Sequence, residues 1–365
     1  MRPVVVAAGG TGGHFFPAEA LAEELMRRGQ RAVLMTDARS GGLASPVFEG
    51  RERFVLAGGG IAGRGMGRAL QSVAALAAGT WQARRILARL RPAAIVGFGG
   101  YPCVAPVIAS RFLADRPALI LHEQNGVLGR ANRMLCRRAD VLALSFAGTA
   151  RVPEGVRTEV TGNPVRPVIT AQPYTPPGAE IRLLVIGGSL GARVFSDIVP
   201  PSLALLPATL RARLVVTQQC RAEDLDRVRA AHAVSGIAAT LAPFFADVAG
   251  LLAGAHLVIA RAGASTVAEL AVVGRPAILV PLPSAIDDHQ SANAAALGDG
   301  AWVMPQATAT PSALAERLAE LFGDPGALAR AASAAARARR PDAAARLADL
   351  VEHAIDKTAL QERRA

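Results

Sequence analysis

The stretch of residues 181–193 constrains the fold most, because an apolar run ends abruptly in glycines there. The run at residues 183–186 is followed by Gly187, Gly188, Ser189 and Gly191, and then by a segment that can form a helix. This pattern is typical of a buried parallel strand that turns into a helix with an open N-terminus. Glycines let a ligand approach the backbone closely, and the free N–H groups of such a helix favour an anion.

The same pattern occurs at the N-terminus. The apolar residues 4–8 lead into the sequence GGTGGH at residues 9–14, and residues 18–28 have helical character. Two strand–glycine–helix patterns, one in each half of the chain, predict an α/β fold with two similar nucleotide-type domains facing one cleft. The length of 365 residues also favours two domains, because one hydrophobic core seldom serves so long a chain.

Further strands are predicted along both halves. They lie at residues 31–35, 54–56, 93–96, 118–121 and 141–144, and at residues 214–217, 257–260 and 277–280. Residues 163–178 contain five prolines, which predicts a stiff linker between the domains. Helices are predicted at residues 311–322, 325–340 and 341–363.

Charge and cysteine content indicate the partners and the compartment. The formal net charge is +11, so acidic partners are expected: nucleic acid, nucleotide phosphates or anionic lipid. The 3 cysteines form no CxxC pair, which favours a reducing compartment over a structural metal site. The N-terminus lacks a signal-peptide layout, and no apolar run reaches the length of a membrane span, so we expect a cytosolic protein, at most attached to a membrane face.

Residues 68–91 have a helical pattern that allows two interpretations. Leu70, Val73 and Trp81 recur at roughly helical spacing, and arginines cluster at the C-terminal end. The segment is either an ordinary core helix with a basic tail or a face that contacts anionic lipid. The glycine-rich residues 58–67 before it are predicted to form a loop.

The glycine stretches match no common cofactor motif. Residues 9–14 contain neither the GxGxxG dinucleotide fingerprint nor a GK[ST] phosphate loop, which disfavours NAD-dependent and ATP-hydrolysing chemistry. They bind a phosphate or form a tight turn. Residues 187–191 match GxSxG, and Asp247 with His289 could complete a hydrolase triad. That interpretation leaves residues 9–14 without a role.

The segment at residues 261–270 follows another strand. Gly263 and Ser265 could open a helix there, and Glu269 lies about one turn in. A carboxylate at that place either accepts both hydroxyls of a ribose or simply favours the helix N-terminus.

Two acidic clusters fit a metal site poorly. Asp287, Asp288 and His289 are adjacent and have no apparent fourth ligand. Asp224 and Asp226 mimic the DxD of metal-dependent glycosyltransferases but fall in a helix-like, charged segment. We therefore predict no metal and no cofactor.

Together these motifs resemble the MurG family of UDP-N-acetylglucosamine transferases, in glycosyltransferase family 28. The resemblance covers nearly the whole chain and runs through residues 9–14, 99–101, 122–125, 162–166, 187–192, 261–269 and 287–293. It implies the GT-B fold, with two Rossmann-like, doubly wound parallel-sheet domains and a cleft between them. It also implies an acceptor- and membrane-facing domain at residues 1–162, a UDP-sugar domain at 163–340, and a helix at about 341–365 that packs back on the first domain.

The resemblance also implies roles for individual residues. On the donor, Phe245 lies against the uracil, Glu269 takes the ribose hydroxyls, Gln290 contacts the sugar, and Arg166 reaches in from the linker. The diphosphate meets Ser189 and the helix start formed by Gly263, Ala264, Ser265 and Thr266. Ser265 and His289 depart from the residues that are common in the family, leucine and glutamine, which bears on fine contacts to the donor.

Acceptor-side residues follow in the same way: Thr11, Gly12, Gly13 and Asn125 complete the site. His14 is the expected general base, because imidazole titrates near neutral pH. Glu123 is the alternative base, and His14 could instead only orient the acceptor diphosphate.

The implied reaction is inverting and independent of metal. It moves N-acetylglucosamine from UDP-N-acetylglucosamine to undecaprenyl-pyrophosphoryl-N-acetylmuramyl-pentapeptide, a step of peptidoglycan synthesis, at the cytoplasmic face of the inner membrane. The expected partners are this donor, the polyprenyl-linked acceptor and the anionic membrane surface, without nucleic acid. The alternatives are a GT-B enzyme with another lipid or natural-product acceptor, and a non-catalytic sugar-nucleotide-binding protein.

Overall fold

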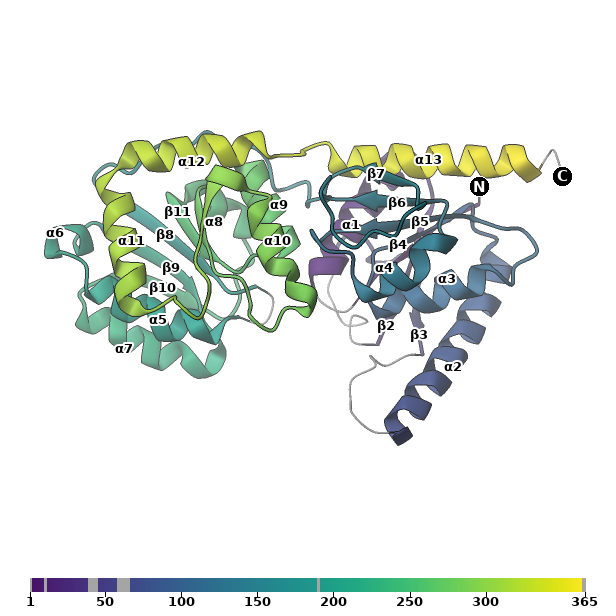
Figure 1. The fold of residues 1–365 in the computed structure, drawn as a ribbon, viewed down its shortest axis with the longest axis horizontal. Helices are drawn as coiled ribbons and strands as arrows, with labels where there is room; N and C mark the ends of the chain where they lie inside the picture. The colour runs from purple at the N-terminus through teal and green to yellow at the C-terminus, as the bar shows by residue number, and fades with distance from the viewer. Residues whose placement is uncertain (1, 10–11, 39–44, 58–65, 189–190, 363–365) are drawn as a thin grey trace. The chain divides into compact units, whose positions relative to one another are not determined.

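The chain divides into two compact units of parallel α/β structure (Figure 1). The computed structural model describes residues 2–9, 12–38, 45–57, 66–188 and 191–362. Unit 1 comprises Met1–Arg166 together with Asp342–Ala365, and unit 2 comprises Pro167–Pro341.

Unit 1 contains a seven-stranded parallel sheet in the order β3-β2-β1-β4-β5-β6-β7. Its strands are β1 (Val4–Ala7), β2 (Ala32–Asp37), β3 (Arg53–Leu56), β4 (Ala94–Gly97), β5 (Ala118–Glu123), β6 (Val141–Leu144) and β7 (Thr158–Val160). Its helices are α1 (Gly12–Arg27), α2 (Met66–Leu90), α3 (Val104–Ser110), α4 (Arg130–Leu135) and α13 (Ala343–Glu362).

The inner strands of this sheet are buried on both faces, as is typical of a parallel sheet. Val4 and Val6 of β1 face a core shared with α1 and α13. Val5 and Ala7 face a second core, which includes residues of α2, α3 and α4. The strand order reverses between β1 and β4, which leaves a crevice at their carboxyl ends where ligands bind in such folds.

Unit 2 repeats the plan with a six-stranded parallel sheet in the order β10-β9-β8-β11-β12-β13. Its strands are β8 (Ile181–Ile186), β9 (Leu214–Gln219), β10 (Ala238–Ala242), β11 (Leu257–Ala260), β12 (Ala277–Leu279) and β13 (Ala301–Val303). Its helices are α5 (Arg193–Ala204), α6 (Ala208–Arg211), α7 (Leu225–Val234), α8 (Val248–Gly254), α9 (Ala264–Val273), α10 (His289–Ala295), α11 (Pro311–Gly323) and α12 (Pro325–Arg337). The reversal here lies between β8 and β11.

The structure departs from the sequence predictions mainly at the sheet edges. Edge strands β7, β10 and β13 were not predicted, since they lack a buried face and therefore an apolar run. Helix α1 begins at Gly12 rather than at residue 18, with Pro17 inside it. Proline so near the start removes only one intrahelical hydrogen bond. Most of the loop predicted at residues 58–67 lies outside the described residues.

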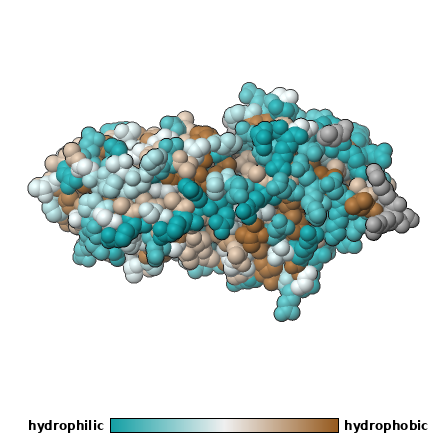
Figure 2. Space-filling model, turned by 90° about the horizontal axis from the view of Figure 1, so that it is seen from above, coloured by the Kyte–Doolittle hydropathy of each residue, from teal (hydrophilic) through white to brown (hydrophobic). Residues whose placement is uncertain are grey.

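Helix α2 is only partly a core helix. Ala83 and Leu87 are fully buried, whereas Val73 is 66% and Trp81 60% exposed. The interpretation as an ordinary core helix is therefore wrong for the face that carries Val73 and Trp81. Among the described residues, no helix has the length and apolar character needed to cross a bilayer. The face shown in Figure 2 is largely hydrophilic, with hydrophobic patches between.

One arginine ties the C-terminal helix α13 to α1. Arg28 donates to Asp349 (2.6 Å) and Glu352 (2.8 Å) of α13, and also to the Ala345 carbonyl (3.1 Å). It also donates to Glu24 of α1. These bonds to charged groups add to the apolar contacts that hold α13 on unit 1.

We expect Arg28→Met to loosen α13. Losing partly buried bonds to charged groups should cost about 1–2 kcal/mol, which corresponds to about 5- to 30-fold faster amide exchange. Hydrogen exchange measured by mass spectrometry should show this increase in peptides of α13. The control Arg27→Met removes an arginine whose ion-pair partner, Glu24, lies on its own helix; equal exchange in the two variants would contradict the account.

Candidate functional site

The predicted donor residues gather at the carboxyl edge of the unit 2 sheet. Strand β8 ends in a tight turn, in which the Gly191 N–H donates to the Gly188 carbonyl (3.0 Å). Gln219, at the end of β9, accepts from the Gly187 N–H (3.0 Å) and donates to the Gly188 carbonyl (2.9 Å). This amide holds the start of the turn from the neighbouring strand.

Two of the glycines in this turn are closely surrounded by neighbouring atoms. A Cβ on Gly187 would lie 2.2 Å from the Ala192 nitrogen, and one on Gly191 2.9 Å from Arg221 Cγ. Gly188 and Gly191 also have positive φ values of 86° and 69°, a conformation that glycine adopts without strain. Ser189, the predicted diphosphate contact, lies outside the described residues.

Helix α9 opens at the end of the adjacent strand β11. Its N-cap is Gly263, and no side chain caps it. Gly263 has no side chain with which to cap the first turn, and the helix dipole adds partial positive charge there. The sequence prediction that the helix starts here agrees with the structure.

Arg261, directly after β11, holds the same edge together by hydrogen bonds. Its guanidinium donates to the carbonyls of Val280 (3.0 Å) and Pro281 (3.2 Å) and to Gln306 Oε1 (2.6 Å). It also lies over the Phe195 ring at 5.4 Å. Burial lowers the pKa of Arg261 from its usual value. Because it is fully engaged by the protein, this arginine fixes β11 and β12 rather than offering a free charge.

The remaining donor-side residues lie on nearby segments of unit 2. Glu269 follows Ser265 and Thr266 on α9 at a spacing that places it on one face with them. Gln290, on α10, accepts from the Leu282 N–H (3.0 Å). Phe245 is half-buried between β10 and α8.

The acidic and histidine side chains before α10 contact residues of their own segment. Asp287 and Asp288 both have positive φ, 55° and 53°. Asp288 accepts from Ser291 (2.8 Å), and His289 donates to the Ile286 carbonyl (2.8 Å). Within the described ranges, no group of three potential ligand side chains surrounds a common point.

The two other sequence hypotheses for unit 2 find little support. Asp247 caps α8 by accepting from the Gly250 N–H (2.8 Å). Its carboxylate therefore serves its own helix rather than orienting a histidine. Asp224 is buried and paired with Arg221 (2.9 Å) and Arg227 (3.0 Å), whereas the Asp226 side chain is fully exposed. The DxD pattern therefore does not present two carboxylates to one ion.

In unit 1, His14 lies at the carboxyl edge beside the end of β4. Its Nδ1 donates to the Phe98 carbonyl (2.8 Å), which leaves Nε2 unprotonated in the neutral ring. The buried Gln124 amide contacts the same Nδ1. Because Nδ1 donates, the Gln124 atom that faces it has to be Oε1, which otherwise has no partner.

The GG pair after β4 fits against this ring. Gly99 and Gly100 have φ values of 75° and 66°. A Cβ on Gly100 would lie 3.5 Å from His14 Cδ2. Thr11 lies outside the described residues, and Gly12 and Gly13 form the first turn of α1.

Glu123, the alternative base, is buried in a closed set of donors. Oε1 accepts from the N–H of Asn125 (2.9 Å) and from its Nδ2 (3.0 Å). Oε2 accepts from the Gly129 N–H (2.9 Å) and from Asn132 Nδ2 (2.9 Å). A carboxylate that already accepts from four protein donors has little capacity left to take a proton from a substrate. The geometry therefore favours Glu123 as the group that positions Asn125.

Two further basic residues of unit 1, His122 and Arg166, pack against aromatic rings. His122 is fully buried, packs against Phe98 and donates to the Gly162 carbonyl (3.1 Å). Burial lowers the pKa of His122 to about 4, so it is neutral at physiological pH. Arg166 stacks over the Phe16 ring at 4.7 Å.

Sequence reasoning missed three positioning residues: Gln219, Gln124 and Asn132. Gln219 and Gln124 lie at or just after strand ends, which is the one signal that could have singled them out. Their partners are distant in sequence, as in the contact of Gln124 with His14, so no local pattern identifies them.

Comparison with known proteins decides the family. Models of the glycosyltransferase family 28 N-terminal and C-terminal domains match residues 4–143 and 182–347. The chain belongs to glycosyltransferase family 28. This family 28 chain is 64% identical over 362 residues to the UDP-N-acetylglucosamine--N-acetylmuramyl-(pentapeptide) pyrophosphoryl-undecaprenol N-acetylglucosamine transferase of Granulibacter bethesdensis, covering 97% of this chain and 94% of that protein.

Other relatives agree. The transferase of the same name from Gluconobacter oxydans is 53% identical over 97% of this chain and 99% of its own length. The crystal structure of Acinetobacter baumannii MurG superposes with a TM-score of 0.76 at 30% identity, covering 97% of this chain and all of that one. The family 28 chain is thus a glycosyltransferase with the GT-B fold. The predicted fold class and family are confirmed.

We expect Glu123→Gln to destabilise unit 1. The amide would point its NH₂ at N–H donors in a buried site, at a cost of about 1–3 kcal/mol. Urea denaturation measures the change. The matched control is Glu159→Gln, on the exposed edge strand β7; the positioning role of Glu123 is wrong if both variants unfold at the same urea concentration.

Proposed function

We propose that this enzyme moves N-acetylglucosamine from UDP-N-acetylglucosamine to undecaprenyl-pyrophosphoryl-N-acetylmuramyl-pentapeptide, completing the lipid-linked disaccharide of peptidoglycan. Identity of 64% along almost the whole of a transferase of that name carries this conclusion. The geometry of both units is compatible with it.

Unit 2 is proposed to hold the donor. The open start of α9 at Gly263 and the turn at Gly187 lie at the ends of adjacent strands, β11 and β8. The first turn and dipole of α9, beside the turn that follows β8, suit a diphosphate at this switch point. Glu269, about one turn further along α9, would then accept the ribose hydroxyls, with Phe245 at the uracil and Gln290 at the sugar.

Unit 1 is proposed to supply the base. The acceptor hydroxyl oxygen attacks the anomeric carbon, and the bond from that carbon to the β-phosphate oxygen breaks. His14 Nε2 takes the hydroxyl proton, because Nδ1 is committed to Phe98. The single displacement inverts the anomeric configuration. Thr11, Gly12, Gly13 and Asn125 complete this acceptor side.

The leaving diphosphate gains negative charge as UDP departs. The dipole and N–H groups at the start of α9 stabilise that charge from a fixed position, and this is how the reaction is proposed to proceed without a metal.

Purified enzyme should therefore transfer labelled N-acetylglucosamine to the lipid-linked acceptor in EDTA. A product that forms only when magnesium or manganese is added would exclude this metal-free step.

Unit 1 is also proposed to rest on the cytoplasmic face of the inner membrane, since a polyprenyl acceptor cannot leave the bilayer. Trp81 of α2 and Phe112 after α3 are each 60% exposed, and Met134 of α4 is 50% exposed. Arginines accompany them: Arg85 lies over the Trp81 ring at 4.7 Å, and Arg111 and Arg138 line a hollow with Phe112 and Met134. Exposed apolar side chains edged by arginine suit an anionic interface.

We expect Glu269→Ala to weaken UDP binding. The loss leaves two ribose hydroxyls unpaired in a half-buried site, at a cost of about 1–3 kcal/mol. Calorimetric titration with UDP measures it, with Glu316→Ala on the exposed side of α11 as the control. Unchanged affinity in Glu269→Ala would remove this carboxylate from the donor site.

We expect the double variant Trp81→Ser, Phe112→Ser to bind anionic vesicles more weakly while UDP affinity is retained. Co-sedimentation at low and high salt measures the binding, which should be peripheral and salt-sensitive. The control is Leu205→Ser, Val234→Ser in unit 2, where the side chains are 59% and 91% exposed. If the unit 1 variant pellets like the parent, the membrane face lies elsewhere.

A further inference from the structure

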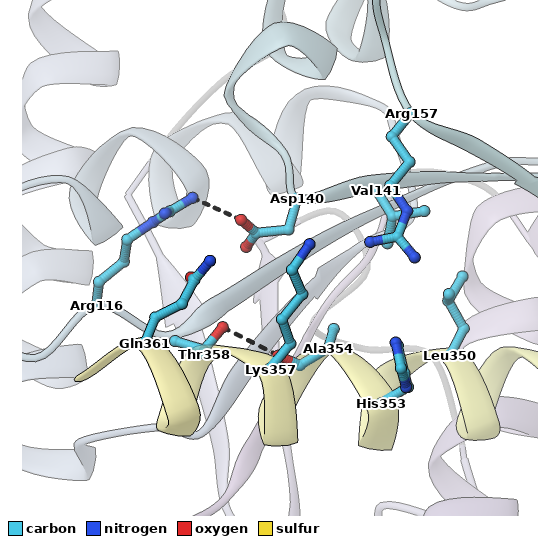
Figure 3. A pocket seen from close by; sticks show the side chains of 10 residues that line it. All are labelled: Arg116, Asp140, Val141, Arg157, Leu350, His353, Ala354, Lys357, Thr358 and Gln361. Atoms are coloured by element: carbon cyan, nitrogen blue, oxygen red, sulfur yellow. Dashed lines mark hydrogen bonds and ion pairs between the residues drawn. The ribbon is translucent and has the colours of Figure 1, made fainter. Parts of the chain in front are cut away.

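A second hollow of unit 1 lies at the amino edge of the sheet, beneath α13 (Figure 3). It is a cavity of about 120 Å³. Asp140 and Arg157 immediately precede β6 and β7, and Lys357 and His353 extend from α13. His14 and Glu123 lie at the opposite, carboxyl edge, so this cavity is separate from the acceptor side.

The acidic group of the cavity is already neutralised. Asp140 accepts from Arg116 Nη2 (2.7 Å) and from the Leu119 N–H (2.7 Å). Figure 3 shows this pair at one side of the hollow, and Lys357 rising from α13 toward the strand ends. The Arg116 guanidinium therefore already balances the charge of this carboxylate.

Three other basic side chains line the cavity without a protein partner. Arg157, His353 and Lys357 make no side-chain hydrogen bond or ion pair with any residue that the structure describes. All three side chains are exposed, so water screens their mutual repulsion, and a bound anion would offset what remains of it. Arg157 and Lys357 thus leave two positive charges uncompensated at one place.

Lys357 has a further distinction in the sequence: it is the single lysine among the 40 Lys and Arg residues. An ammonium is a compact, strongly hydrated point charge, whereas guanidinium is a planar fork that binds two oxygens side by side. One of each around a cavity suits a tetrahedral oxyanion, in which different oxygens meet different donors. Gln361, also on the lining, offers an amide donor.

We propose that this cavity is a binding site for a phosphate group, held between the Arg157 guanidinium and the Lys357 ammonium, with His353 and Gln361 as hydrogen-bond donors. Its volume of about 120 Å³ gives room for a phosphate group. The bound anion joins α13 to the strand that follows Arg157, so occupancy stabilises the docking of the C-terminal helix. Free phosphate esters and phospholipid headgroups share this chemistry.

The single lysine allows a direct test. Reductive methylation with ¹³C-formaldehyde preserves the charge of amines and labels only the α-amine and Lys357. Titration with inorganic phosphate, against sodium chloride at equal ionic strength, should shift the Lys357 signal to saturation and leave the α-amine signal in place. A Lys357 shift that is the same in chloride, or that does not saturate, overturns the proposal.

Variants locate the binding. Arg157→Gln should weaken phosphate binding at least tenfold. Arg51→Gln, which replaces an exposed arginine of the same unit, should not weaken it. Phosphate should also raise the melting temperature of the parent and of Arg51→Gln, but not that of Lys357→Gln. This second readout remains informative if methylation disturbs the site, and equal stabilisation of all three proteins contradicts the proposal.

Two further arms distinguish the sources. Glycerol 3-phosphate should compete with inorganic phosphate in either case. If vesicles of phosphatidic acid bind Arg157→Gln and Lys357→Gln less well than Arg51→Gln, the site takes a lipid headgroup; if vesicle binding is equal while phosphate affinity falls, it takes a soluble anion. If glycerol 3-phosphate and inorganic phosphate do not compete, and the variants bind phosphate as tightly as the parent, the proposed site is wrong.

Discussion

The structure depends on one constraint, which is the reversal of strand order in each parallel sheet. At such a reversal, the loops that follow two adjacent strands run to opposite faces of the sheet, and a crevice opens between them. Both units have this reversal, between β1 and β4 and between β8 and β11. Backbone N–H groups at such an edge lack strand partners, so they must find a side chain, water or a ligand. The glycines at positions 99, 100, 188 and 191 have positive φ and allow the chain to turn within that narrow space.

The two crevices are completed by different chemistry. In unit 2 the edge offers backbone N–H groups, and the buried polar side chains Arg261 and Gln219 are occupied in holding strands and turns. In unit 1 the edge offers an imidazole whose tautomer is set by Phe98, and a buried carboxylate that positions Asn125. A diphosphate needs fixed donors and an acceptor hydroxyl needs a proton acceptor, so this division matches the proposed reaction.

Much of this was predictable where the signal is local. Buried interior strands, such as Val141–Leu144 and Leu257–Ala260, have the bounds predicted from their apolar runs, and Gly263 opens a helix as its place after β11 indicates. Edge strands β7, β10 and β13 have too little buried surface to leave an apolar pattern. The closed hydrogen-bonding of Glu123 with Gly129 and Asn132, and the cavity beneath α13, depend on contacts across the fold, which spacing alone does not encode.

The central claim is that unit 2 alone supplies the nucleotide site, at the reversal between β8 and β11. Hydrogen exchange with and without UDP tests it most directly, because bound phosphate oxygens protect the N–H groups they accept from. The account predicts slower exchange at the start of α9 and in the turn that follows β8, with no change at the start of α1. Protection confined to the N-terminal glycine stretch and α1 would contradict it.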